Sequence, residues 1–242
     1  MRVKTDVLGV LYDNVTMQEA LERGRALLEG SEAVYCVTPN AEMAYEALHD
    51  IKFREVLNAA SLVLPDGAGV VLGAKLLKTP LKEKVAGIEF AQNLLPILEE
   101  TGKRLFLLGS KPGIAELAAE KMLEKHPKLC VCGTMDGYFK DEAEAVRRIN
   151  EAQADVVYVC LGAPKQEYFM HDHAHELNVK LMIGLGGTLD GIAGTVKRAP
   201  KWMIRLQLEW LYRLIKEPRR LGRMMRLPKF IFAAIKMRMK GT

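Results

Sequence analysis

Short apolar runs rich in β-branched residues alternate with longer amphipathic stretches through most of this 242-residue chain. Such runs, bounded by turn-forming residues, predict strands, and apolar positions three or four residues apart predict helices. The predicted strands are 3–11, 34–37, 62–64, 104–108, 129–132, 156–161 and 181–183. The predicted helices are 41–57, 68–77, 88–100, 113–125, 142–150 and 166–177, after a first helix that Thr16 and Glu19 open with a capping box. This order predicts an α/β fold, a mostly parallel Rossmann-like sheet flanked by helices, with strand 3–11 as an edge element.

Polar residues gather where predicted strands give way to helices, which is where open parallel sheets bind ligands. Thr38 and Asn40 follow one strand, Asp66 follows the next, and Gln166 lies in the segment 162–167 after a third. We expect these side chains to meet at one edge of the sheet. Asn and Asp are also common helix N-caps. For Asn40 and Asp66 a capping role and a functional role therefore both stay open.

Two further junctions suit a nucleotide. The segment 109–113, Gly-Ser-Lys-Pro-Gly, joins a strand to a helix, and small residues with free helix N–H groups suit a phosphate. Tyr138 follows the next strand and could stack on a base. Each feature also has a plain structural explanation, a tight turn for the glycines and cover for the sheet edge for Tyr138.

Charge is divided very unevenly along the chain. Residues 196–242 hold fourteen Lys or Arg and two Glu, and since the whole chain has 35 basic and 30 acidic residues, the preceding part holds 21 and 28. This break predicts a catalytic domain over 1–195 and a basic amphipathic appendage over 196–242. Such an asymmetry indicates an anionic partner.

Large apolar side chains are interleaved with the basic residues of the appendage, among them Trp202, Trp210, Phe230 and Phe232. This mixture favours an anionic membrane surface, where apolar groups enter the headgroup boundary and cations meet phosphates. Nucleic acid is disfavoured as a partner because exposed Met, Phe and Ile gain nothing on a phosphate backbone. The alternatives are a helix pair packed on the body and a homo-oligomer formed through the exposed apolar groups.

The sequence predicts a cytoplasmic protein. We find no signal-peptide pattern and no apolar window long enough to span a bilayer. The four cysteines, Cys36, Cys130, Cys132 and Cys160, stand in or beside apolar runs and are predicted to be reduced core residues.

The sequence gives no metal site. His171 and His175 are spaced to share a helix face, but no carboxylate motif completes a site, so a solvated face is favoured. No two Asp residues are separated by a single residue, so the D-x-D arrangement that clamps a metal on a sugar nucleotide is absent.

Several of these segments together resemble the TagA/WecG/CpsF glycosyltransferases. The similarity runs from about residue 8 to residue 226 and rests on Thr38-Pro39-Asn40-Ala41-Glu42, Pro65-Asp66-Gly67, Gly162-Ala163-Pro164-Lys165-Gln166-Glu167, Gly186-Gly187-Thr188, Arg198-Ala199-Pro200, Leu208-Glu209-Trp210-Leu211-Tyr212-Arg213-Leu214 and Glu217-Pro218-Arg219-Arg220.

The resemblance implies an inverting, metal-independent transfer without a cofactor. An N-acetylmannosamine-type sugar would move from a UDP donor to polyprenyl-diphosphate-linked N-acetylglucosamine, giving a β-1,4-linked disaccharide for wall teichoic acid or a surface polysaccharide. It implies a peripheral enzyme on the inner face of the bacterial plasma membrane. A non-catalytic protein that binds a nucleotide sugar or another polyanion is the alternative.

The resemblance also assigns roles to residues. Asp66 would be the general base, Thr38 and Asn40 would orient the sugars, and Gln166 would contact the sugar diphosphate. The other binding residues would be Lys84, Gly109, Tyr138, Gly162, Lys165, Glu167, Gly187 and Asp190, together with Arg213, Arg220 and Arg223, whose guanidinium groups suit the leaving diphosphate. The family usually has Arg at the position of Lys84 and often Phe at that of Leu189.

Overall fold

A computed structural model describes residues 3–196, 199–200, 202–203, 209–216, 222 and 225–240. Its centre is a six-stranded, fully parallel sheet in the order β4-β3-β8-β7-β5-β6. The strands are β3 (Val34–Val37), β4 (Leu62–Val63), β5 (Arg104–Gly109), β6 (Cys130–Met135), β7 (Val156–Cys160) and β8 (Leu181–Gly184). The predicted α/β class and parallel sheet are confirmed.

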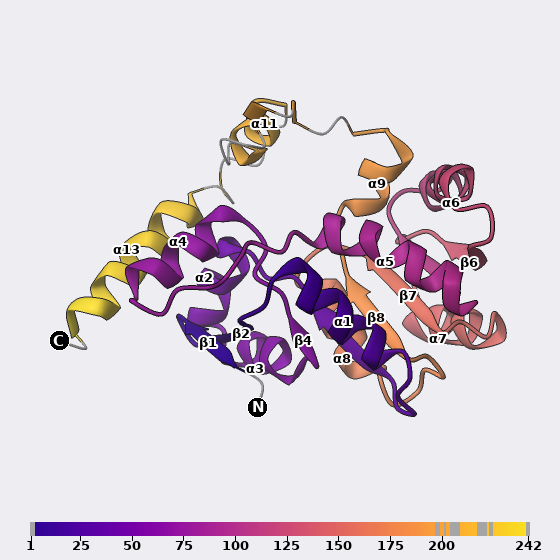
Figure 1. The fold of residues 1–242 in the computed structure, drawn as a ribbon, viewed down its shortest axis with the longest axis horizontal. Helices are drawn as coiled ribbons and strands as arrows, with labels where there is room; N and C mark the ends of the chain where they lie inside the picture. The colour runs from indigo at the N-terminus through magenta and orange to yellow at the C-terminus, as the bar shows by residue number, and fades with distance from the viewer. Residues whose placement is uncertain are drawn as a thin grey trace.

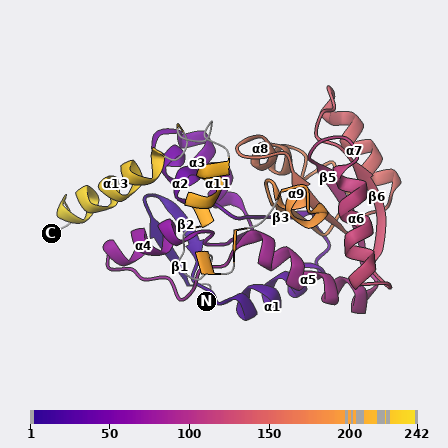
Figure 2. The same cartoon turned by 90° about the horizontal axis from the view of Figure 1, so that it is seen from above.

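Helices cover both faces of the sheet because successive strand residues point to opposite sides. Tyr35 and Val37 join one buried cluster, whereas Cys36 joins the other. The first cluster is completed by α2 (Ala41–His49), α3 (Ile51–Ala59), α4 (Ala68–Leu76), α7 (Glu142–Glu151), α8 (Lys165–Asp172) and α13 (Arg226–Lys240). The second is completed by α1 (Met17–Leu27), α5 (Gly87–Thr101), α6 (Ile114–Lys125) and α9 (Thr188–Ala193). Helices α2, α4 and α13 lie at one end of the molecule, and α6 and α7 at the other (Figures 1 and 2).

The predicted single strand over 3–11 is wrong. The chain instead forms an antiparallel hairpin of β1 (Lys4–Val7) and β2 (Val10–Asp13), separate from the large sheet. It turns at Leu8 and Gly9, which both have positive φ angles, 57° and 90°. The fully buried Asp13 ties the hairpin to the sheet, because its Oδ2 accepts hydrogen bonds from the Val63 amide at 2.9 Å and from Lys4 Nζ at 3.0 Å.

Three other element boundaries differ from the prediction. Asp50 adopts an extended conformation and caps Phe53, which divides the predicted helix 41–57 into α2 and α3. Helix α8 ends at Asp172, earlier than predicted. Strand β6 runs on to Met135 through Gly133, where a Cβ would lie 2.6 Å from the Phe106 ring. The short helix α9 was not predicted.

The cysteine prediction holds for two of four residues. Cys36 and Cys160 are buried, Cys132 is half-buried and Cys130 is exposed, all as free thiols. Cys130 is exposed because it begins β6, the edge strand of the sheet, which has a neighbour on one side only.

Helix α13 packs on α4 and α2 through one face. A Cβ on Gly73 would lie 2.6 Å from the Phe230 ring, and a Cβ on Gly69 would lie 2.7 Å from Leu227 Cδ1. Arg226 Nη1 also donates to Glu46 Oε2 of α2 at 2.7 Å. Part of the basic segment therefore completes the core, while the domain boundary near residue 196 stays a prediction.

The opposite face of α13 is exposed. Phe232 is 68% and Met239 is 74% exposed, with Ile235 between them on the same side of the helix. The other described helix of this segment is α11 (Glu209–Lys216). No helix among the described residues is long and apolar enough to cross a bilayer.

Truncating a side chain on the buried face of α13 should lower the free energy of unfolding much more than truncating one on its exposed face. Phe230→Ala removes a fully buried ring and should lower the free energy of unfolding by about 3–5 kcal/mol. Phe232→Ala, two residues away on the same helix, should change it by less than about 0.5 kcal/mol because that ring is exposed. Urea unfolding followed by circular dichroism measures both, and equal losses would contradict the docking of α13.

Candidate active site

The polar residues predicted to meet do lie at one edge of the sheet. Thr38, Asp66 and the loop after β8 all follow the carboxyl ends of neighbouring strands, since β4, β3 and β8 are adjacent and parallel. Figure 1 labels β4 and β8 with the helices α4 and α9 that follow them, and Figure 2 labels β3 and α2.

Thr38 is the centre of this group. The residue is almost buried, at 9% exposed, and its hydroxyl donates to the Gly184 carbonyl oxygen at 2.9 Å, which joins the ends of β3 and β8. A Cβ on Gly87 would lie 3.0 Å from Thr38 Oγ1, so α5 begins in direct contact with this side chain. The Gly87 amide in turn donates to Asp66 Oδ2 at 3.4 Å. Thr38 and Asp66 are thus held on either side of Gly87.

Asn40 caps the helix that follows it, but Asp66 does not. Asn40 Oδ1 accepts from the amides of Glu42 at 2.9 Å and Met43 at 3.0 Å, so it is the N-cap of α2. The N-cap of α4 is Gly67, which has no side chain to cap it. Asp66, half-buried, turns toward α5 instead.

Asn40 and Asp66 are nevertheless close neighbours. A Cβ on Gly67 would lie 3.9 Å from Asn40 Cβ. The Tyr12 hydroxyl donates to the Pro39 carbonyl oxygen, next to Asn40, at 3.2 Å. Its pKa is raised by burial and, to a lesser extent, by the negative charge of Asp66. Both residues therefore border the loop that Thr38 opens, and Tyr12 is a supporting residue that no sequence pattern indicated.

Gln166 and Glu167 lie beneath the neighbouring loop. Gln166 is 3% exposed; its Nε2 donates to Glu167 Oε1 at 2.7 Å, and its Oε1 accepts from the Gly186 amide at 2.9 Å. Glu167 is fully buried. In this conformation neither residue presents a surface to a ligand, and the sugar-diphosphate contact expected of Gln166 stays a prediction.

The environment of Glu167 favours its uncharged form. Burial raises the pKa of this carboxyl to about 7; the hydrogen bonds from Gln166 and the backbone oppose the shift, and the charge of Glu46 adds to it. Glu46 is itself paired with Arg226. Near neutral pH this carboxyl is therefore partly protonated, whereas an ordinary glutamate is ionised.

This shift predicts a pH-dependent stability. Because the folded pKa exceeds the unfolded one, the contribution of Glu167 is fully present below about pH 4.5 and is lost as the pH rises through about 7, a change of up to about 3 kcal/mol. Glu167→Gln does not titrate, so the wild type should lose stability relative to this variant between pH 5 and pH 8.

Denaturant unfolding over that pH range measures the free energy of unfolding of both proteins. The difference between the two values cancels the titration of His173, which is present in both. Glu120→Gln, on the exposed surface of α6, is the matched control and should follow the wild type. Parallel curves for the wild type and Glu167→Gln would contradict the raised pKa.

A second group forms at the ends of β5, β6 and β7. Gly109 lies so close to β7 that a Cβ would meet the Cys160 carbonyl oxygen at 2.3 Å. Ser110, with φ of 61°, donates from its hydroxyl to Asp190 Oδ2 of α9 at 2.8 Å. Tyr138 is 67% exposed beside them, in a loop whose Gly137 amide donates to the Ser110 carbonyl at 2.9 Å. Gly109, Tyr138 and Asp190 are thus brought to one corner, as the predicted nucleotide site requires.

The remaining predicted binding residues are spread around these groups. Lys84 is half-buried, and the amide of its neighbour Val85 donates to the Pro65 carbonyl at 2.9 Å, beside Asp66. Lys165 Nζ lies 4.4 Å from the centre of the Phe139 ring. The backbone N–H of Gln166 donates to the Gly162 carbonyl oxygen at 3.0 Å. Gly187, the residue after Gly186, is exposed.

Two of the three predicted arginines, Arg220 and Arg223, lie outside the described residues. Arg213 belongs to α11, of which the structure describes the backbone at this position but not the side chain. Their place relative to the two groups stays a prediction.

Comparisons with known proteins identify the family. A model of the glycosyl transferase WecG/TagA/CpsF family matches residues 5–242. The chain belongs to this family.

Its relatives share one name, N-acetylglucosaminyldiphosphoundecaprenol N-acetyl-beta-D-mannosaminyltransferase. The chain is 37% identical to the Bacillus spizizenii W23 protein over 209 residues, covering 86% of this chain and 81% of the relative. Identity is 39% over 199 residues with the Bacillus subtilis 168 protein, covering 82% and 78%. It is 33% over 240 residues with the Staphylococcus aureus MRSA252 protein, covering 98% and 94%.

Sequence reasoning missed several supporting residues of this WecG/TagA/CpsF family member. Gly87 and Gly184 suit these positions because a Cβ at Gly87 would lie 3.0 Å from Thr38, and one at Gly184 would lie 2.8 Å from Met170 Cε and 3.0 Å from Gln166 Nε2. The glycine before each helix or loop was the available signal, but which side chain fills the space depends on contacts across the chain.

The histidines that the structure describes are not gathered into a group of metal ligands. His175 lies beyond the end of α8, so it does not share a helix face with His171, contrary to the prediction. Burial lowers the pKa of His173, but hydrogen bonds to Glu176 and Glu142 outweigh it and leave the pKa raised. Among the residues that the structure describes, no group of three or more His, Cys, Asp or Glu side chains could hold a metal ion.

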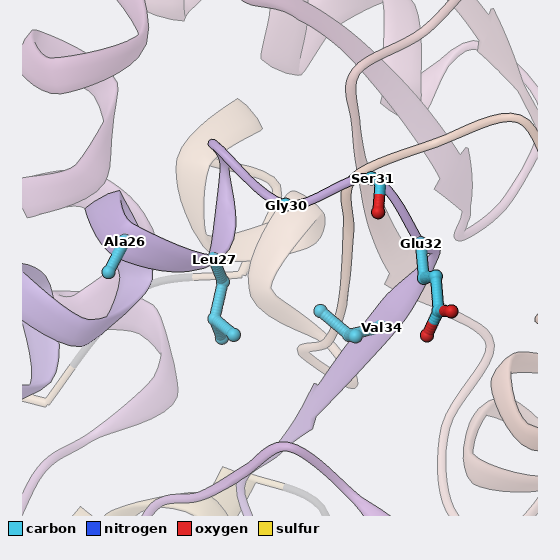
Figure 3. A pocket seen from close by; sticks show the side chains of 6 residues that line it. All are labelled: Ala26, Leu27, Gly30, Ser31, Glu32 and Val34. Carbon is cyan, nitrogen blue, oxygen red and sulfur yellow. The ribbon is translucent and has the colours of Figure 1, made fainter.

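One hollow of about 270 Å³ lies elsewhere, at the amino end of β3 (Figure 3). It is lined by Ala26, Leu27, Gly30, Ser31, Glu32 and Val34. Open parallel sheets bind ligands at their carboxyl ends, so this hollow, at the opposite edge, does not belong to the candidate active site of this glycosyltransferase-family chain.

Proposed function

We propose that this chain transfers N-acetylmannosamine from a UDP-sugar to polyprenyl-diphosphate-linked N-acetylglucosamine, with inversion, to give a β-1,4-linked disaccharide. The observation that carries the proposal is the shared name of relatives that match nearly the whole chain. The convergence of Thr38, Asn40 and Asp66 at the carboxyl edge of the sheet supports it. The product would feed wall teichoic acid or a surface polysaccharide.

Asp66 is the proposed general base. Inversion by single displacement needs a group that takes the proton of the acceptor hydroxyl as its oxygen attacks the anomeric carbon. A half-buried carboxylate that does not cap the helix following it, and that accepts from the first amide of α5, suits this task. Thr38 and Asn40 border the same loop and would orient the two sugars.

The nucleotide of the donor is proposed to lie at the Gly109, Tyr138 and Asp190 corner. The leaving UDP needs positive charge or N–H groups to stabilise it. Lys84 and Lys165 lie around the strand ends, and Arg213, Arg220 and Arg223 are proposed to reach the diphosphate from the basic segment. No metal or cofactor enters this proposal.

The acceptor is carried by a lipid, so the proposal places the enzyme on the inner face of the plasma membrane. The exposed face of α13 supports this, because Phe232, Ile235 and Met239 lie along it with Lys229, Lys236 and Arg238 nearby. Apolar groups of this kind enter the headgroup boundary, and each basic residue near an anionic surface adds about 1 kcal/mol. Self-association through the same face is the competing proposal.

Asp66→Asn tests the chemistry. Loss of a general base should lower the rate of UDP release about 10²–10⁴-fold while binding of the UDP-sugar persists, because the amide keeps the shape of the carboxylate. The assay uses a short-chain lipid-diphosphate N-acetylglucosamine acceptor, a panel of UDP-sugars, and separate reactions in EDTA and in magnesium.

Asp141→Asn is the matched control, since it replaces one good N-cap of α7 with another. A wild-type protein that binds UDP-sugar but releases no UDP would favour the non-catalytic alternative. Activity in magnesium alone would contradict the metal-independent reaction.

Vesicle binding tests the membrane proposal. Phe232→Ser with Ile235→Ser should weaken co-sedimentation with anionic vesicles, because both side chains are exposed and neither supports the core. Binding should also fall as salt is raised. Unchanged sedimentation, or preferential binding to oligonucleotides, would count against a membrane role.

A further inference from the structure

Glu167 is a buried carboxyl group with too few partners. It is fully buried, and its Oε2 atom has no hydrogen-bond partner among the residues that the structure describes. Asp13 is equally buried, but it is surrounded by Lys4, Arg23 and the Val63 amide. Glu167 Oε1 instead accepts from the neutral side-chain amide of Gln166. Pairing with a positive charge, which explains the burial of Asp13, therefore does not explain the burial of Glu167.

The explanation lies in the orientation of Gln166. The Nε2 group of its side-chain amide donates to Glu167 Oε1 at 2.7 Å, and the Oε1 atom of the same amide accepts from the backbone N–H of Gly186 at 2.9 Å. If the amide turned by 180°, its NH₂ group would face the Gly186 N–H, and its carbonyl oxygen would face the Glu167 carboxyl. The Gly186 N–H and the Glu167 Oε1 acceptor together therefore select the one orientation in which Gln166 can hold Gly186.

The loop that Gln166 holds is next to the candidate active site. Gly184 ends β8 and accepts the Thr38 hydroxyl, and Gly186, with φ of 55°, leads to the exposed Gly187 and into α9. A Cβ on Gly184 would lie 3.0 Å from Gln166 Nε2, so the amide lies directly against this backbone. The side chain of Gln166 thus links α8 to the loop beside Thr38.

We propose that Glu167 is a positioning residue, which fixes the amide of Gln166 and through it the Gly186–Gly187 loop beside Thr38. The inference rests on the proposed function for its kinetic consequence alone, because the loop itself can be observed without a substrate. Glu167 is not a catalytic residue in this proposal, since its side chain is fully buried.

Three variants separate positioning from simple packing. Glu167→Gln keeps a carbonyl oxygen for Gln166, Glu167→Met keeps the volume but removes every acceptor, and Glu167→Asp shortens the side chain so that it no longer reaches. Glu120→Met, on the exposed surface of α6, is the control. Hydrogen–deuterium exchange of a peptide over residues 182–190 reports the Gly186 amide, and UDP release gives kcat and KM.

We expect Glu167→Met and Glu167→Asp to raise exchange of this peptide at least about tenfold over the wild type. Their kcat should fall about 10- to 100-fold, with a KM for the UDP-sugar within about threefold of the wild type. Glu167→Gln and Glu120→Met should match the wild type in both measurements.

Unchanged exchange in both Glu167→Met and Glu167→Asp would overturn the proposal, as would raised exchange with unchanged kcat. A Glu167→Gln variant with normal exchange but no turnover would also overturn it, since the acid itself would then be needed. If Glu167→Met does not fold, Glu167→Asp decides. A wild type that releases no UDP refutes the proposed function, and the exchange result still decides the structural role of Glu167.

Discussion

The candidate site depends on how closely the backbone of β8 and the start of α5 approach Thr38. The hydroxyl of Thr38 reaches the Gly184 carbonyl at 2.9 Å, and Gly87 lies against the same side chain. A β-carbon at Gly87 would compete for this space, and one at Gly184 would compete with Gln166. Two glycines and one threonine therefore bring the start of α5 against the paired ends of β3 and β8, and the Gly87 amide at this contact donates to Asp66.

Much of the fold and of the site was predictable from local patterns. Apolar runs located all six strands of the large sheet. Five of them are almost wholly buried and so have a strong local signature, whereas the end of the less buried edge strand β6 was misplaced. The rule that parallel strands share a carboxyl edge was enough to bring Thr38, Asn40 and Asp66 together. The hairpin was missed because Leu8, which turns the chain with a positive φ, has a side chain that gives no turn signal.

What the sequence could not resolve was the use made of each polar side chain. Asn40 and Asp66 look alike as caps, but only Asn40 bonds to the helix that follows it. Gln166 and Glu167 stood in a binding motif, yet the structure buries both and turns one toward the other. These outcomes depend on Gly87 and Gly186, which come from distant parts of the chain, so no local pattern could give them.

Helix α4 follows directly after Asp66, and its glycine face is covered by Leu227 and Phe230 of α13. Ribosomes make the chain from the amino end, so this face is synthesised long before the residues that shield it. During most of translation, the residues of α4 have been synthesised but Leu227 and Phe230 have not. The loop that holds Asp66 therefore acquires its final support late, and a partly made chain would display an apolar surface that chaperones recognise.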